Sequence, residues 1–396
     1  MIEVKANLLR GSTFLAGETI EYSLIFTYPN NTNVESRSSR DAVEVLAWAS
    51  AQIHCQCTVS EARVRLPKSP LPTQAEVVTA TNGSTSFLPN RGEKGERGMC
   101  VFSSVPKILF CDLQLSPGES KKYIYRETLP MDAPPSYKGQ AVKYSYKITI
   151  GTQRVNSPIK LLRVPLRVLV VNGILEMKKQ SEEQEPVTPS NPFLQEEEER
   201  PVLEKSMQIL QCATSRRGPN YYNITNARGK VCKFCLFRSS YRLGEDIVGT
   251  FDFTVATIPC VQFSVTLQSE EVVSDEYCCK AGQGCTTISY TKHHDFCLHT
   301  NKTYMALPIP LQITPGFVTD IVALKWKLHF EFVTATQPLE THPIPADQSE
   351  SSTWRGPIDM QVETMVWDMP INIYATNPLQ ASCSATAGTT ANFVVF

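Results

Sequence analysis

One stretch of sequence occurs twice, and this repeat limits the possible folds more than any other feature. Residues 14–27 (FLAGETIEYSLIFT) and 241–254 (YRLGEDIVGTFDFT) share an aromatic residue, a Gly-Glu pair, an Ile two positions after the Glu, and then alternating apolar and polar positions. The matched pairs have a constant offset of 227 residues: Gly17 with Gly244, Glu18 with Glu245, and Ile20 with Ile247. A repeat of that length predicts two copies of one domain within the 396 residues. We expect the Gly-Glu pairs to be turn residues that begin each copy, with no chemistry of their own.

Alternation with a period of two runs through both copies and predicts an all-β fold. The alternating segments are residues 20–26, 45–59 and 142–150 in the first copy, and 261–267 and 324–332 in the second. Proline is frequent, with 27 residues against 19 glycines, which is typical of strands joined by proline-containing loops. The last strand of the first copy contains Pro165, so we expect an edge position or a bulge there.

The chain divides at two changes in composition. Its middle segment contains QSEEQEPVTPSNPFLQEEEERP, which is acidic and has few large apolar residues, so burial cannot offset its conformational entropy. We therefore predict two tandem β-sandwich domains, residues 1–172 and 211–378, joined by an acidic, proline-containing, disordered linker over residues 173–210. Residues 379–396 are rich in Ser, Thr and Ala and are predicted to form a flexible tail.

The charge balance and the apolar pattern exclude several classes of function. Lys and Arg number 38 against 39 Asp and Glu, so no net positive field would gather nucleic acid. No apolar run approaches the ~20 residues that a membrane-spanning helix needs, and no basic and apolar leader opens the sequence. We expect a cytosolic protein whose 13 cysteines are reduced thiols, and which meets a membrane only peripherally, through partners.

Motifs for catalysis or cofactor binding are lacking in the sequence. The glycines of GEKGERG (residues 92–98) are not followed by Gly-Lys-Ser/Thr, so they do not form a phosphate cradle. The chain has no G-x-S-x-G and no H-E-x-x-H pattern. His54 and His329 fall on the polar faces of alternating strands, where solvated or hydrogen-bonded surface histidines are expected. We therefore predict no catalytic residue and no cofactor.

Two groups of residues are candidates for metal binding. Seven cysteines and histidines fall within 22 residues: Cys278, Cys279, Cys285, His293, His294, Cys297 and His299. Zinc could be bound there, yet the spacings fit no paired C-x-x-C pattern and the segment is expected to be a variable loop, so free loop cysteines are favoured. Cys232 and Cys235 lie in a predicted strand, where side chains three positions apart point to opposite faces and cannot chelate one ion.

Two short motifs match ligands of peptide-binding domains. Pro134-Pro135-Ser136-Tyr137 matches the PPxY ligand of WW domains, but it stands directly before a predicted core strand, which favours fixed packing. Asn191, Pro192 and Phe193 form an NPF tripeptide in the predicted linker, where it could dock into an EH domain. A three-residue match also arises by chance, so both interpretations of this tripeptide stay open.

Several long blocks of sequence resemble a known family. The Gly-Glu turn after the first strand, the segment LPMDAPPSYKG and the YSYKI strand that follows are together similar to the arrestin-like fold. A closer resemblance, to the Rgp family, is carried by AWASAQIHCQ, PKILFCDLQLSPGES, VKYSYKITIGTQRVNSPIKLLRVPLRVLV, YRLGEDIVGT, LKWKLHFEFVT and WDMPI. These blocks cover nearly the whole chain outside the loops, and matches of such length are more specific than a short motif.

The resemblance implies a function as a subunit of a complex. Rgp proteins are the smaller partners of Ric, a subunit with β-propellers, and the Ric–Rgp complex is a guanine nucleotide exchange factor for the Golgi GTPase Rab six in endosome-to-Golgi retrograde transport. By resemblance we expect a non-catalytic scaffold of the cytosol and the peripheral Golgi membrane. Two alternatives stay open: an arrestin-type cargo or ubiquitin-ligase adaptor, which needs an exposed PPxY motif, and a zinc hydrolase built on residues 278–299.

Overall fold

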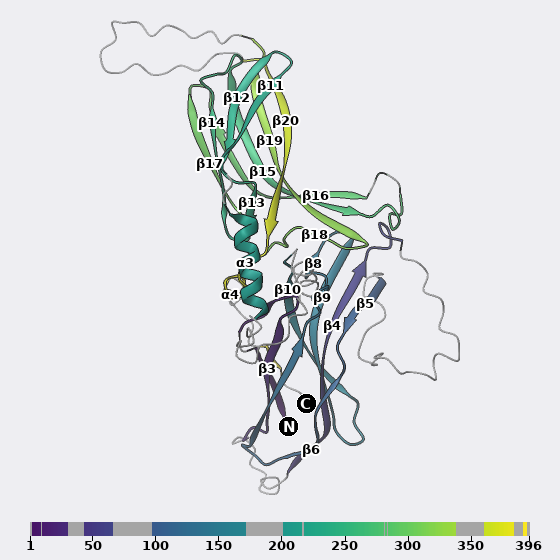
Figure 1. Cartoon of the computed structure of the whole chain (residues 1–396). Helices are drawn as coiled ribbons and strands as arrows, with labels where there is room; N and C mark the ends of the chain where they lie inside the picture. The colour runs from purple at the N-terminus through teal and green to yellow at the C-terminus, as the bar shows by residue number, and fades with distance from the viewer. Residues whose placement is uncertain are drawn as a thin grey trace, which may run out of the picture.

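The computed structural model of the chain describes residues 2–8, 10–30, 43–65, 97–171, 201–215, 218–280, 282, 284–337, 360–383 and 391–393. Strands make up most of these residues, which confirms the predicted all-β class. They form two β-sandwiches that lie end to end, with two helices beside the junction (Figure 1). Among the described residues, no helix is long and apolar enough to cross a membrane. The arrestin-like part of the expectation stays a prediction.

The N-terminal sandwich consists of a four-stranded sheet, in the order β21-β1-β3-β7, and a seven-stranded sheet. The larger sheet has the order β2-β10-β9-β4-β5, with β6 paired to β4 and β8 paired to β9. The strands are β1 (Glu3–Leu8), β2 (Thr13–Leu15), β3 (Thr19–Thr27), β4 (Glu44–Val59), β5 (Arg97–Ser103), β6 (Lys107–Leu115), β7 (Ser120–Thr128), β8 (Tyr137–Lys138), β9 (Val142–Gln153), β10 (Lys160–Leu169) and β21 (Ala391–Phe393).

The C-terminal sandwich repeats this plan with a four-stranded sheet, in the order β11-β12-β14-β17, and a six-stranded sheet. The larger sheet has the order β13-β20-β19-β15-β16, with β18 paired to β19. The strands are β11 (Asn220–Asn226), β12 (Gly229–Leu236), β13 (Ser240–Arg242), β14 (Asp246–Asp252), β15 (Cys260–Val273), β16 (Cys285–Phe296), β17 (Lys302–Pro308), β18 (Phe317–Val318), β19 (Val322–Ala335) and β20 (Val362–Tyr374).

The two strand orders can be matched position by position, and they differ in where one edge strand comes from. β1, β3 and β7 correspond to β12, β14 and β17, so the edge strand β11 has its counterpart in β21. β21 follows the whole C-terminal sandwich in sequence and returns to pair with β1 antiparallel. The prediction of a flexible tail over residues 379–396 is therefore wrong for β21 and for helix α4 (Pro378–Cys383).

The prediction of a disordered linker over residues 173–210 is also wrong for its last residues, from 202 onward. Helix α3 spans Val202–Thr214, directly after Pro201, whose fixed φ suits the start of a helix. Its residues Ser206, Leu210 and Thr214 are buried, one turn apart on the same face. Residues 173–200 lie outside the described residues, and so does the NPF tripeptide.

The period-two pattern explains most of the strands and their shared core. Along β19, Leu324, Trp326, Leu328, Phe330 and Phe332 are all buried, while the residues between them face outward. In β4 the odd-numbered residues from 49 to 59 are all buried, as predicted, although most even-numbered ones there are buried too, and near its start the buried residue is Leu46. The pairing of β4 with β6 is irregular in this region, since β6 has one extra residue, Leu109, opposite residues 49 and 50.

Pro165 lies where its strand is paired on one side only, which confirms the predicted edge position. It stands opposite Lys147 of β9, and the parallel pairing of β10 with β2 begins two residues later, at Arg167. Pro370 in β20 repeats this arrangement, since pairing with β13 begins at Asn372. A proline at such a position removes no hydrogen bond from the sheet.

Candidate functional site: the domain junction and the outer sheet faces

The two Gly-Glu pairs form equivalent turns at the junction end of each sandwich. Gly17 and Gly244 have φ angles of +83° and +84°, a left-handed conformation that favours glycine. The carboxylate of Glu18 accepts a hydrogen bond from the N–H of Leu15 at 3.0 Å, and that of Glu245 from Arg242 at 3.1 Å. Both carboxylates thus close the turn that follows the short parallel strand, which is a structural role.

The carboxylate of Glu271 links the two sandwiches directly. Glu271 lies near the end of β15 and is 1% exposed. It accepts hydrogen bonds from three successive backbone N–H groups of the N-terminal sandwich, those of Gln140 (2.8 Å), Ala141 (3.2 Å) and Val142 (3.1 Å). Successive N–H groups of a turn form a natural anion site, and here a side chain of the other sandwich fills it. Gly139 is required beside it, because a Cβ there would overlap Oε1 of Glu271.

Further contacts tie the turns of the two sandwiches across the junction. Arg167 donates from Nη2 to the carbonyl oxygens of Leu311 at 2.8 Å and Ile313 at 2.9 Å. The hydroxyl of Tyr144 lies 3.1 Å from Oγ1 of Thr319. A second strip of contact is formed by backbone bonds, from Arg65 to the carbonyl of Tyr277 at 2.7 Å and from residue 279 to residue 63 at 3.0 Å. These paired contacts make the two sandwiches one body.

The PPxY motif is part of this junction. Tyr137 is 7% exposed, and its ring centroid lies 5.0 Å from that of Phe317 of the C-terminal sandwich. Ser136 accepts a hydrogen bond at its carbonyl from Thr314 at 3.1 Å, and Pro134 accepts one from the hydroxyl of Tyr146 at 2.6 Å. A polyproline ligand must be free to lie in a groove of its reader, so this arrangement counts against an adaptor that displays the motif.

The cysteine- and histidine-rich segment is only in part the loop that the sequence indicated: Cys278 and Cys279 lie between β15 and β16, but the central residues form a strand. Residues 285–296 form the edge strand β16, whose side chains alternate between opposite faces on either side of a register shift against β15. Cys285 is exposed at one end and Cys297 is buried just beyond the other. Among the described residues, no three His, Cys, Asp or Glu side chains are grouped so that they could hold a metal ion.

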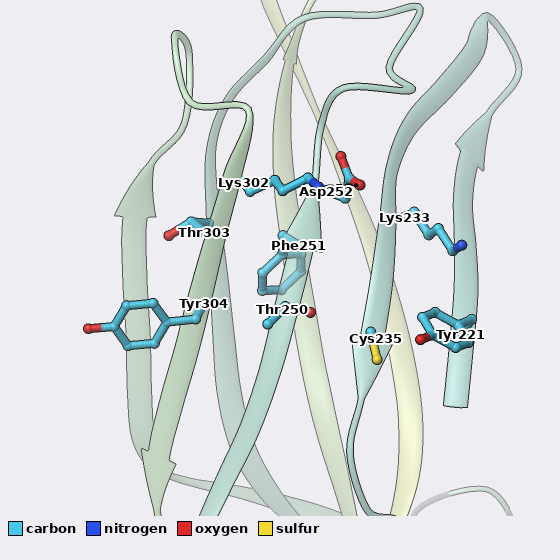
Figure 2. A pocket seen from close by; sticks show the side chains of 9 residues that line it. All are labelled: Tyr221, Lys233, Cys235, Thr250, Phe251, Asp252, Lys302, Thr303 and Tyr304. Atoms are coloured by element: carbon cyan, nitrogen blue, oxygen red, sulfur yellow. Dashed lines mark ion pairs between the residues drawn. The ribbon is translucent and has the colours of Figure 1, made fainter. Parts of the chain in front are cut away.

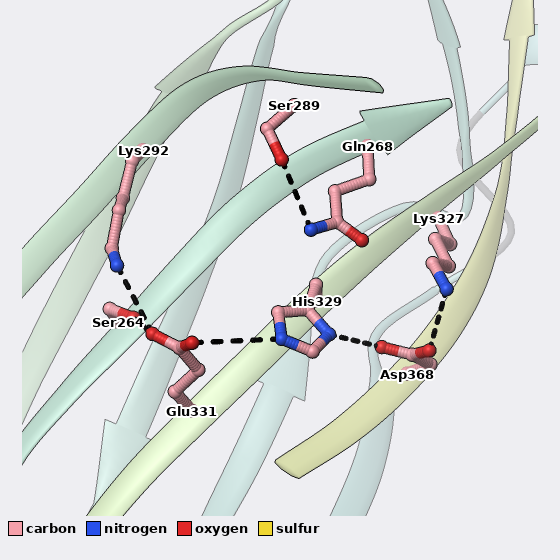
Figure 3. A network of polar contacts seen from close by, with 8 residues as sticks. All are labelled: Ser264, Gln268, Ser289, Lys292, Lys327, His329, Glu331 and Asp368. Carbon is pink, nitrogen blue, oxygen red and sulfur yellow. Dashed lines mark hydrogen bonds and ion pairs between the residues drawn. The ribbon is translucent and has the colours of Figure 1, made fainter. Parts of the chain in front are cut away.

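The outer face of the six-stranded sheet carries a connected row of charges (Figure 3). Lys327 of β19 lies between Glu270 at 2.6 Å and Asp368 at 2.7 Å. His329 contacts Asp368 through Nδ1 at 2.5 Å, and Glu331 pairs with Lys292 at 3.1 Å. Partial burial acts to lower the pKa of Lys327, but hydrogen bonds with Asp368 and Glu270 outweigh it and raise the pKa.

The Lys327 contacts predict a measurable loss of stability when the charge is removed. Lys327→Met leaves two carboxylates facing each other without a cation, and we expect the free energy of unfolding to fall by about 1–2 kcal/mol. Arg126→Met is the matched control, because Arg126 pairs with Glu21 at 3.0 Å on an exposed face, where water screens the pair, so its loss of stability should be clearly smaller. Urea denaturation of both variants measures the difference, and equal losses would contradict it.

The matching face of the N-terminal sandwich contains His54, and here the expectation of a surface histidine is wrong. His54 in β4 is 1% exposed, with Nδ1 3.4 Å from Oγ1 of Thr149. Burial, together with the positive charges of Lys147 and Arg163, lowers the pKa of His54 to about 4. His54 is therefore neutral in the folded protein under ordinary conditions.

This lowered pKa predicts a specific pH dependence of stability. As the pH falls below 6.5, the usual His value, the unfolded chain binds a proton at His54 before the folded chain does. Stability is therefore lost between pH 6.5 and about 4, by up to about 3 kcal/mol. In His54→Gln the slope of unfolding free energy against pH should become shallower in this window. An unchanged slope would show that His54 is not the group responsible.

One feature of the junction, the contact of Glu271 with the N-terminal sandwich, was missed in the sequence. Glu271 continues the inward-facing series Phe263, Val265, Leu267 and Ser269, so a carboxylate at an inward position was a visible signal. The partner groups are backbone N–H groups about 130 positions away, however, and no local pattern indicates them.

Comparison with known proteins places these features in a family. The Rgp1 family model matches residues 72–174 and 170–335. A protein of Homo sapiens named RAB6A-GEF complex partner protein 2 is 49% identical over 403 aligned positions, which cover 100% of both chains. The protein of the same name from Bos taurus is 49% identical over 385 positions and 95% of each chain. The relative matches the chain from end to end at this identity, and the family model covers most of the chain's length. The chain therefore belongs to the Rgp1 family.

Proposed function

We propose that this chain is the non-catalytic scaffold subunit of a complex with Ric, which promotes guanine nucleotide exchange on Rab six during endosome-to-Golgi retrograde transport. The observation that carries the proposal is the 49% identity, over full length, to proteins named as partners in a RAB6A exchange-factor complex. The details of Ric, Golgi and retrograde transport come from the resemblance of the sequence blocks to the Rgp family.

The physical character of the molecule supports a scaffold role. An exchange factor breaks no covalent bond; it binds the nucleotide-free GTPase more tightly than the loaded one, and that difference in affinity speeds release. Such a function needs a shaped and rigid surface. The contacts of Glu271 and Arg167 fix the angle between the two sandwiches, so surfaces on both can face one partner at a constant distance.

We propose further that the protein is cytosolic and reaches the Golgi membrane peripherally, through Ric or through GTPases on that membrane. The balanced charge of 38 basic and 39 acidic residues supports attachment through proteins rather than directly through anionic lipids.

Affinity purification tests the partnership. When the tagged chain is purified from cytosol, Ric should be recovered at equal stoichiometry and should remain bound during gel filtration. Recovery of the folded chain without Ric, in extracts where Ric is present, would contradict the proposal.

A further inference from the structure

A row of four residues forms a hollow on the outer face of the four-stranded sheet of the C-terminal sandwich (Figure 2). Tyr221 is paired with Cys235, Cys235 with Thr250, and Thr250 with Tyr304, so the row crosses all four strands. The tyrosines are 62% and 68% exposed, whereas Cys235 is only 7% exposed although it is on the same face. Small residues thus form the floor and two aromatic side chains form the walls of a hollow of about 410 Å³.

The neighbouring row on the same face supplies positive charge at one end of the hollow. Lys233 stands opposite Asp252, and Asp252 stands opposite Lys302. The ammonium of Lys302 is 3.8 Å from the carboxylate of Asp252, and that of Lys233 is 4.6 Å from the ring centroid of Tyr221. Two cations against one anion leave a net positive charge beside the aromatic walls (Figure 2).

The internal repeat shows that this hollow is not a consequence of the fold. In the N-terminal sandwich the residues paired in the matching row are Asn7, Ser23 and Ile124, where the C-terminal sandwich has Cys235, Thr250 and Tyr304. Two residues further along β3 and β7, on the same face, Glu21 and Arg126 form an ion pair at 3.0 Å that covers the sheet there. The same backbone is therefore stable without two exposed tyrosines.

Exposed tyrosines around a recessed floor are typical of protein-binding surfaces. Tyrosine is enriched among the residues that contribute most to protein binding, because it buries a large area at a low cost in conformational entropy. An apolar side chain on the floor would lie over Cys235 and Thr250, on the two strands between those that carry the tyrosines. Polar lysine heads at the rim would select an anion beside it.

We infer that this hollow binds an extended acidic segment of the large partner subunit, with an apolar side chain between Tyr221 and Tyr304 and a carboxylate against Lys233 and Lys302. Residues two apart along a strand are roughly 7 Å apart on one face. The carboxylate is therefore expected two residues from the apolar side chain in the bound segment. This inference rests on the proposed function, since it takes Ric as the partner.

Binding of the purified full-length chain to purified Ric tests the inference. The double variant Tyr221→Ala/Tyr304→Ala should weaken the affinity at least about tenfold. Thr250→Trp, which fills the floor and leaves both walls in place, should weaken it similarly. Ile124→Ala, at the position of Tyr304 in the other sandwich, is the matched control. Its affinity for Ric should stay within about twofold of that of the chain without substitutions.

Charge reversal tests the acidic part of the segment separately. Lys233→Glu/Lys302→Glu should slow association with Ric and remove most of its dependence on salt, whereas Lys122→Glu on the N-terminal sandwich should not. Variants that unfold at the same temperature as the unchanged chain and bind Ric with unchanged affinity would overturn the inference and leave the proposed function standing. An unchanged chain that does not bind Ric at all would refute the proposed function, and this inference with it.

Discussion

Glu271→Ala is expected to lower the free energy of unfolding by about 3 kcal/mol or more, the largest effect of any single polar substitution at the junction. The substitution leaves the N–H groups of residues 140–142 without their acceptor, in a place where the carboxylate is 1% exposed. Glu271→Gln keeps one accepting oxygen, so its free energy of unfolding should fall by about half as much. Chemical denaturation followed by tryptophan fluorescence measures both.

The neighbouring residue Glu270 is the matched control for this prediction. Glu270 is also an acidic residue of β15, but it faces outward and pairs with Lys327 on the sheet surface. Glu270→Ala should cost about 1 kcal/mol or less. If Glu271→Ala and Glu270→Ala cost the same, the carboxylate of Glu271 does not hold the sandwiches together. Small-angle scattering should also show a wider range of shapes for Glu271→Ala alone.

Phe251→Ala is expected to lower the free energy of unfolding by about 3–5 kcal/mol. Phe251 is fully buried, and its ring centroid lies 4.2 Å from that of Phe263 and 4.7 Å from that of Phe234. Truncation removes the contacts among several rings and leaves a cavity that rigid strands cannot close. The loss is measured from the urea midpoint and slope.

Phe251→Leu serves as the control, because it keeps most of the buried volume. It should cost about 1–2 kcal/mol, mainly through lost aromatic contacts. A loss below about 1 kcal/mol for Phe251→Ala would contradict the view that these rings form the centre of the C-terminal core.

Local patterns in the sequence were sufficient to predict the repeat and many of the strands. A strand that is buried on one face must alternate, and β19 shows this over its whole length. The Gly-Glu turns were also visible, since a left-handed residue favours glycine and both glycines have φ near +83°. These features depend only on neighbours within a few residues.

Features that depend on distant partners could not be predicted in this way. β21 is a strand because β1 offers an unpaired edge, and its own Ala-Asn-Phe sequence gives no such signal. Helix α3 has a narrow apolar stripe, with Leu203, Met207 and Leu210 at helical spacing, which the acidic residues before it obscured. The hollow between Tyr221 and Tyr304 requires the register of four strands, which the period of two does not determine.

The most direct test of the account is the rate of guanine nucleotide release from Rab six, measured with a fluorescent GDP analogue. We predict that the purified chain alone leaves the intrinsic rate unchanged or nearly so, and that the complex of the chain with Ric accelerates release well above the rate with either protein alone. Full acceleration by this chain without Ric would contradict the scaffold assignment, and so would full acceleration by Ric without this chain.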